Sequence, residues 1–229
     1  MHYLYWDIDG TLLLTGHAGI AALQEAIRLK FNTNDFQFSH TLAGCTDTQI
    51  VKTAIKEIKG SCTAADAAGV LIHYYRLLPD FLAKHHGYLL PNVEQTLASL
   101  PKANFTSALL TGNASPAAHL KLKHFGLTTH FDYTLSVFGE LSEDRDMLAQ
   151  VALHKLKLQN PKITANQITI IGDTPNDIKC AHAIGARSLI VLSGSTYSAT
   201  ELASYHPWKI IPELPVAIKD LLAILEVRS

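Results

Sequence analysis

The chain has 229 residues, of which 48% are hydrophobic and 17% charged, and its formal net charge at pH 7 is -1. This composition supplies a sizeable apolar core and excludes a globally disordered chain. The near-neutral charge gives no electrostatic reason to expect nucleic acid or an anionic membrane as a partner.

The start of the chain does not resemble a secretory signal peptide, because it enters an aromatic segment and then acidic residues without a charged leader. No run of about 18 apolar residues exists, so no membrane span is expected. The three cysteines are widely spaced, form no zinc pattern and suit buried apolar positions: Cys45, Cys62 and Cys180. We expect a cytoplasmic protein that is a monomer or a homodimer.

Short aliphatic and aromatic stretches alternate with helical patterns along most of the chain. The predicted strands are Tyr3–Ile8, Thr106–Leu110, Tyr133–Phe138, Gln167–Ile171 and Arg187–Leu192, with a weaker candidate at Trp208–Ile211. The predicted helices are Pro116–Phe125, Arg145–Leu158, Asn176–Ile184 and Glu213–Leu225. This alternation predicts an α/β fold with a Rossmann-like parallel sheet, whose strands are covered on both faces.

The stretch from about residue 14 to residue 88 breaks this rhythm, because it contains helical patterns and little strand signal. Three amphipathic helices are predicted there, Ile20–Phe31, Asp47–Ile58 and Thr63–Lys84, the last with a possible capping arrangement. We therefore predict an all-helical domain, residues 15–88, inserted into a core made of residues 1–14 and 89–229.

Two acidic residues lie where the first predicted strand ends, in the sequence Asp7-Ile8-Asp9-Gly10-Thr11. Because ligands of parallel α/β sheets bind beyond the carboxyl ends of the strands, both carboxylates can reach one cavity there. Gly10 permits the unusual backbone of such a turn. The alternative is an ordinary acidic turn.

A second acidic group follows the strand Gln167–Ile171, in the sequence Gly172-Asp173-Thr-Pro-Asn-Asp177. If the two strands are neighbours, Asp7, Asp9 and Asp173 converge. Their carboxylates would repel one another unless a cation joins them. Oxygen ligands favour a hard cation, and Mg²⁺ is the usual choice beside a phosphate.

A third signal is Thr111-Gly112-Asn113, which follows the strand Thr106–Leu110. A hydroxyl at a strand end, followed by glycine and a helix, offers its oxygen and backbone N–H groups to an anion. Taken alone, this sequence is also typical of a plain turn.

Together, these motifs resemble the haloacid dehalogenase (HAD) superfamily over essentially the whole chain. Asp7-x-Asp9-Gly10-Thr11 is similar to its first motif, Thr111 to its second, and Gly172-Asp173-x-x-x-Asp177 to its fourth. The helical insertion is similar to the first type of HAD cap. A Gly44-Cys45-Thr46-Asp47 segment makes the chain most similar to the phosphoglycolate phosphatase and β-phosphoglucomutase group.

The third motif departs from the family pattern, because its usual Lys is absent from residues 140–148. Arg145 is the best substitute, since a guanidinium can hold phosphate oxygens with two parallel hydrogen bonds. The alternative is a solvated Arg145 paired with Glu143 or Asp144. Cys45 replaces a basic residue found in some relatives, so their substrate preference does not transfer directly.

The resemblance implies a Mg²⁺-dependent phosphatase acting on a small phosphorylated metabolite. Asp7 would be the nucleophile and Asp9 the general acid and base. Thr111, Gly112, Asn113 and Arg145 would hold the phosphoryl group. The metal would be bound by Asp7, by the backbone carbonyl of Asp9, by Asp173, and by Asp177 directly or through water.

Two alternatives stay open: a phosphosugar mutase on the same scaffold, and a catalytically silent phosphate-binding protein. Dehalogenation is disfavoured, because relatives with that activity typically lack the second Asp. The insertion would act as a lid with hinges near residues 14–19 and 87–91. Candidate residues for substrate selection in the lid are His17, Thr46, Asp47 and Arg76.

Overall fold

The computed structural model describes residues 2–39 and 42–225. The strands are β1 (His2–Trp6), β2 (Leu13–Leu14), β3 (Tyr88–Leu89), β4 (Phe105–Leu109), β5 (Ile168–Gly172), β6 (Arg187–Val191) and β7 (Lys209–Ile211). The α-helices are α1 (Ala18–Phe31), α2 (Asp47–Lys59), α3 (Ala64–Lys84), α4 (Val93–Ser99), α5 (Ser115–His124), α6 (Arg145–Gln159), α7 (Pro175–Ala183), α8 (Ala199–Ala203) and α9 (Ile218–Ile224). Short 3₁₀ turns occupy Leu100–Ala103, Thr128–His130 and Ala165–Gln167.

The core is a five-stranded sheet in the order β4-β1-β5-β6-β7, and each neighbouring pair is parallel. This confirms the predicted α/β class. Trp6 at the end of β1 pairs with Leu109 of β4 and with Ile171 of β5. The residues that follow these three strands therefore leave the sheet at one edge, where parallel α/β proteins bind their ligands.

Alternation along β1 explains how both faces of the sheet are covered. Leu4 and Trp6 belong to one apolar cluster, whereas Tyr3 and Tyr5 belong to another on the opposite face. Because side chains alternate along a strand, a strand buried on both faces must be apolar at every position. Helices α4 and α9 contribute to the first cluster, and α6 and α7 to the second.

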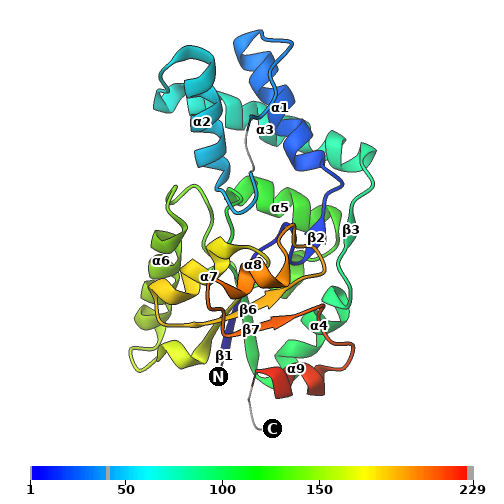
Figure 1. The fold of residues 1–229 in the computed structure, drawn as a ribbon, viewed down its shortest axis with the longest axis vertical. Helices are drawn as coiled ribbons and strands as arrows, with labels where there is room; N and C mark the ends of the chain where they lie inside the picture. Colours follow the sequence, from blue (N-terminus) through cyan, green and yellow to red (C-terminus); the bar gives the residue numbers. More distant parts are fainter. Residues whose placement is uncertain (1, 40–41, 226–229) are drawn as a thin grey trace.

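Helices α1, α2 and α3 gather beyond one end of the core and, together with Ala117 of α5, form a separate apolar cluster (Figure 1). A capping box between Thr63 and Asp66 starts α3, as the sequence predicts. The two chain crossings pair as β2 and β3, with Leu13 opposite Leu89 and Leu14 opposite Tyr88. We call α1–α3 with their loops the cap; its division from the core at residues 15 and 88 stays a prediction.

Two predicted elements differ in the structure. Tyr133–Phe138 is not a strand, and Val137 alone forms an isolated bridge with Leu110. The carboxylate of Asp132 accepts hydrogen bonds from the backbone N–H groups of Thr134 and Leu135, which turns the backbone away from an extended path.

The last helix begins at Ile218 rather than at Glu213. Pro215 disfavours helical backbone at Leu214. The carbonyl of Leu214 instead accepts a hydrogen bond from Nδ2 of Asn92. The helices α4 and α8 and the strands β2 and β3 had no counterpart in the predicted elements. Within residues 2–39 and 42–225, no helix has the length and apolarity that a membrane crossing requires.

Candidate active site

Three buried carboxylates meet where β1 and β5 end. Asp7, Asp173 and Asp177 each offer an oxygen, and these oxygens lie within 4.8 Å of one another. Gly10 allows this approach: its φ is +83°, and a Cβ at this position would collide with the carboxylate of Asp173. An all-oxygen, buried and anionic donor set fits a hard divalent cation such as Mg²⁺.

The three carboxylates differ in the number of hydrogen bonds that they accept from neighbouring N–H and hydroxyl groups. Oδ1 of Asp7 accepts a hydrogen bond from the N–H of Ile8 at 2.8 Å, and Oδ1 of Asp173 accepts one from the Thr11 hydroxyl at 2.9 Å. Oδ2 of Asp177 accepts three, from Thr174 Oγ1 and from the backbone N–H groups of Asp173 and Thr174. Asp177 therefore also caps the start of α7.

Arg145 lies at this cluster and not at the surface. Its Nη1 lies 3.3 Å from Oδ2 of Asp7, and its Nη2 lies 2.6 Å from Oδ1 of Asp177. The alternative pairing with Glu143 is wrong, because Glu143 instead pairs with Lys52 of α2 at 2.5 Å. Among the residues that the structure describes, none is hydrogen-bonded to Nε of Arg145, which is buried.

Burial and mutual repulsion shift the acidity of the cluster. Burial is the largest cause that raises the pKa of Asp7 to about 6, and Arg145 opposes it. Burial, and then repulsion by Asp177 and Asp7, raises the pKa of Asp173 well above its usual value. A bound cation would favour the ionised carboxylates and reverse both shifts.

The carboxylate of Asp9 does not join this cluster, which corrects the expectation that residues 7, 9 and 173 converge. Its Oδ2 lies 2.5 Å from Nζ of Lys121 and accepts a hydrogen bond from Nδ2 of Asn113 at 2.7 Å. Lys121 also donates to Oδ1 of Asn113 at 2.6 Å. The Asp9 side chain is 42% exposed and lines a cavity, so it is held on one side and open on the other.

Lys121 is the residue that the sequence reasoning missed. It lies in α5 among the buried residues Ala117, Ala118 and Leu122, and its own exposure is 4%. The spacing of these apolar residues places a lysine on the buried face of the helix. A buried lysine needs a hydrogen-bonding or charged partner. The spacing of the apolar residues around Lys121 could therefore have indicated it as a candidate site residue.

The segment after β4 brings the remaining predicted residues to the same edge. The Thr111 hydroxyl accepts hydrogen bonds from the backbone N–H of Asn113 at 3.3 Å and from Asn113 Nδ2 at 3.1 Å. The Gly112 carbonyl accepts a hydrogen bond from the N–H of Asp47, so this loop of the core also contacts the cap.

The predicted selection residues of the cap lie in different places. Asp47 is buried against the core, where its carboxylate accepts a hydrogen bond from the N–H of Ala114 at 2.8 Å. Thr46 is buried and caps α2 through Gln49. His17 is exposed and lines the cavity, whereas Arg76 is exposed on α3 and is not among the cavity-lining residues described.

The structure also places the three cysteines. Cys180 is buried, whereas Cys45 and Cys62 are partly exposed, and each is a free thiol. The expected buried position is therefore confirmed for Cys180 and wrong for Cys45, which lines the cavity, and for Cys62.

Comparison with known proteins identifies the family. Residues 4–191 match the profile described as haloacid dehalogenase-like hydrolase, and the chain therefore belongs to this family. This confirms the family that the motifs indicate.

The individual proteins that this chain resembles share a third or less of their aligned residues with it. A phosphoglycolate phosphatase of Vibrio parahaemolyticus is 32% identical over 124 residues, which is 53% of this chain and 51% of that protein. The chain thus spans about half the length of this curated relative. A tyrosine-protein kinase PtkA of Mycobacterium tuberculosis is 26% identical over 194 residues, 81% of this chain and 60% of that one. A hydrolase from Pseudomonas syringae has the same fold, with a TM-score of 0.73, 20% identity and coverage of 100% of both chains.

Proposed function

We propose that this protein is a Mg²⁺-dependent phosphatase that hydrolyses a phosphate monoester through an aspartyl-phosphate on Asp7. The observation that carries the proposal is the buried cluster of Asp7, Asp173 and Asp177 beside Arg145, at the carboxyl edge of the sheet. Family membership and similarity to a phosphoglycolate phosphatase support it.

Asp7 is the nucleophile in this proposal. One of its carboxylate oxygens attacks the phosphorus, and the ester P–O bond on the opposite side breaks. Water then attacks the phosphorus of the aspartyl-phosphate, the bond to Asp7 breaks, and inorganic phosphate leaves. Arg145 favours the ionised nucleophile, because its guanidinium lowers the pKa of Asp7 against the effect of burial.

Asp9 moves the protons in both half-reactions. It gives a proton to the leaving alkoxide oxygen and later takes one from the attacking water. Lys121 and Asn113 both bind Oδ2 of Asp9, so they fix the carboxylate while it faces the cavity. A fixed donor loses little orientational freedom in the transition state.

In this proposal, the phosphoryl group lies between the loop that follows β1 and the loop that follows β4. The Thr111 hydroxyl, the backbone around Gly112 and Asn113, and the guanidinium of Arg145 hold its oxygens. Arg145 also forms ion pairs with both Asp7 and Asp177, so it fixes the position of the nucleophile relative to this second proposed metal ligand.

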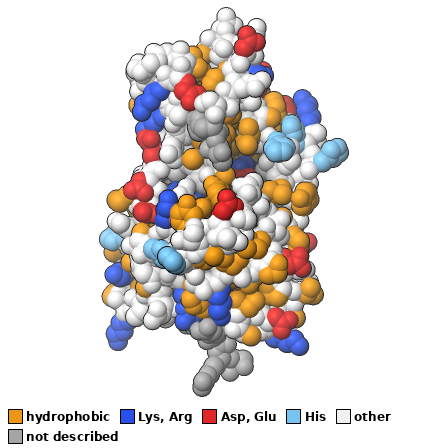
Figure 2. Space-filling view, viewed as in Figure 1, with side chains coloured by type: hydrophobic (Ala, Val, Ile, Leu, Met, Phe, Trp, Pro, Cys, Tyr) orange, Lys and Arg blue, Asp and Glu red, His pale blue; other side chains and the backbone are white. Residues whose placement is uncertain are grey.

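Asp7, Asp173 and the backbone carbonyl of Asp9 would hold Mg²⁺, and Asp177 would support it directly or through water. When bound, the ion supplies positive charge that neutralises the phosphoryl oxygens. We further propose a small phosphorylated metabolite as ligand, a cytoplasmic location, and a monomer or homodimer. We propose no nucleic acid or membrane partner; on the face drawn in Figure 2, acidic and basic side chains are interspersed, which agrees with this proposal.

The decisive experiment compares Asp7→Asn with the wild type. Phosphate release from p-nitrophenyl phosphate is followed with and without Mg²⁺, and a far-ultraviolet circular dichroism spectrum checks the fold. We expect the variant to lose turnover and keep the fold. Asp80→Asn, at an exposed carboxylate on α3, is the matched control and should retain full activity. Substantial Mg²⁺-dependent turnover by Asp7→Asn would remove Asp7 from its role.

A further inference from the structure

A cavity of about 660 Å³ lies between the cap and the core, directly over the candidate site. Asp7, Asp9 and Arg145 form its floor, and residues of α1, α2 and α3 form its roof. Pockets of roughly 300–1,000 Å³ hold drug-sized ligands. The space therefore suits a leaving group much larger than a two-carbon acid.

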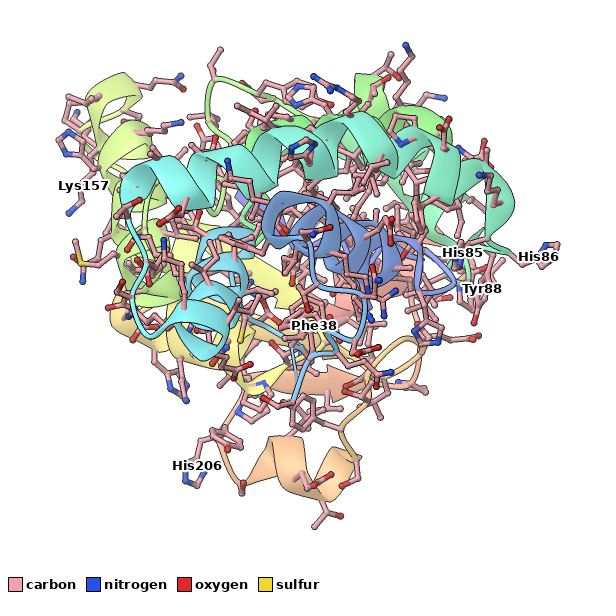
Figure 3. All side chains as sticks on the ribbon, turned by 90° about the horizontal axis from the view of Figure 1, so that it is seen from above. Phe38, His85, His86, Tyr88, Lys157 and His206 are labelled. Atoms are coloured by element: carbon pink, nitrogen blue, oxygen red, sulfur yellow. The ribbon has the colours of Figure 1, made fainter. Side chains whose placement is uncertain are left out.

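The walls above the carboxylates are mainly apolar. Leu23 and Tyr74 come from α1 and α3, Ile50 from α2, and Leu14 and Tyr88 from the paired crossings. In Figure 3, Tyr88 lies near His85 and His86, in the segment that follows α3. Such walls offer a carbon skeleton a large contact area, but they offer few partners to sugar hydroxyls.

Two apolar side chains at this cavity are unusually exposed. Ile20 is 45% exposed and Tyr88 is 55% exposed, and both belong to the cavity lining. An apolar ligand that covers them would remove this surface from water, which is favourable in proportion to the area covered.

The charged side chains of the described lining already have partners within the protein, apart from His17. Lys121 is paired with Asp9, and Arg145 with Asp7 and Asp177. The carboxylate of Asp47 is bound to the backbone of Ala114. Among the described lining residues, His17 is the remaining group that can become cationic. The described part of the lining thus offers no free permanent cation to a second anionic group on the substrate.

We propose that the substrate is a phosphate monoester of a bulky apolar alcohol, whose carbon skeleton lies against Leu14, Ile20, Leu23, Ile50 and Tyr88 beneath the cap. This inference rests on the proposed phosphatase function and names the substrate class of the same site.

A homologous series of n-alkyl phosphates from methyl to octyl tests it, with the full chain, Mg²⁺ and phosphate release as the readout. These esters share nearly the same leaving-group chemistry and differ in apolar area. Each buried methylene should raise kcat/KM about fourfold until the cavity is filled. Octyl phosphate should also exceed 2-phosphoglycolate in kcat/KM.

Two variants localise the effect. Ile20→Gln should lower the octyl-to-methyl ratio of kcat/KM about fivefold, since about half of an isoleucine side chain would lose its apolar contact. Ile72→Gln is the matched control, because Ile72 is 57% exposed on α3 outside the described cavity lining, and this variant should keep the wild-type ratio.

A kcat/KM that is flat or falls with chain length, or that is highest for 2-phosphoglycolate, would overturn the substrate class and leave the phosphatase proposal in place. An unchanged ratio in Ile20→Gln would overturn the assigned contact surface. Absence of phosphate release from every ester would overturn the proposed function together with this inference.

Discussion

Replacement of Arg145 by Met tests the electrostatics of the candidate site directly. Arg145 is 6% exposed, and it bridges Asp7 and Asp177. Met has a similar length and no charge, so the substitution removes the cation without opening a large cavity.

The magnitude follows from the separation of the carboxylates. At 4.8 Å and an effective dielectric constant of about 20, two ionised carboxylates repel each other by about 3.5 kcal/mol. Removing one partner of a buried ion pair costs about 3–5 kcal/mol. In EDTA, we therefore expect the free energy of unfolding of Arg145→Met to be about 3–5 kcal/mol lower than that of the wild type.

Mg²⁺ should restore much of this loss, because a divalent cation supplies the missing counter-charge. The increase in melting temperature on adding Mg²⁺ should therefore be larger for Arg145→Met than for the wild type. The turnover number should still fall about 10²-fold or more, as for a lost donor to the transition state. Arg145→Lys, which keeps the charge, is the control and should lie between the two proteins.

The assays are thermal unfolding in EDTA and in Mg²⁺, together with phosphate release from p-nitrophenyl phosphate. An Arg145→Met protein with wild-type stability in EDTA, the same response to Mg²⁺ and a near wild-type rate would refute the reasoning. Arg145 would then carry no part of the charge balance at this site.

Three further predictions concern the neighbours of the cluster. Lys121→Met should lower kcat about 10–10²-fold with little change in melting temperature, because Asp9 loses its fixed orientation yet stays hydrated; a kcat within twofold of wild type would contradict this. Burial raises the pKa of Asp47 to about 6 from 3.8, so the folded state binds the extra proton between these values and the free energy of unfolding falls as pH rises through this window. Asp47→Asn should lack this dependence, gaining up to about 3 kcal/mol over wild type between pH 4 and pH 7 in urea titrations, and parallel pH profiles would argue against it. Gly112→Ala should lower kcat/KM at least tenfold while circular dichroism is unchanged, because a Cβ there collides with the Cys45 carbonyl of the cap; full activity would show that the cap need not seat in this way.

Much of the architecture could be predicted from local sequence patterns. The strand after the N-terminus, the helices of the cap and the three strand-end motifs depend on periodicity and turn chemistry, which act over a few residues. The wrong prediction of a strand at Tyr133–Phe138 has a local cause as well. The Asp132 side chain accepts hydrogen bonds from the backbone N–H groups that a strand would use.

The parts that could not be predicted depend on contacts between distant segments. The carboxylate of Asp9 binds Lys121, which lies 112 residues away, instead of joining the cluster of Asp7, Asp173 and Asp177. The Asp47 carboxylate meets the N–H of Ala114 across 67 residues, and this contact attaches the cap to the core. The hydrophobic periodicity of a sequence does not indicate which side chain of one element contacts a distant element.

The sequence alone determined the family, the parallel sheet and the acidic residues at its edge, because strand ends and motif spacing are properties of short segments. The tertiary structure alone decided which carboxylates lie within 4.8 Å of one another, which lysine is paired with Asp9, and how large and apolar the space beneath the cap is. Those properties are set by the packing of helices against the sheet, and packing depends on every element at once.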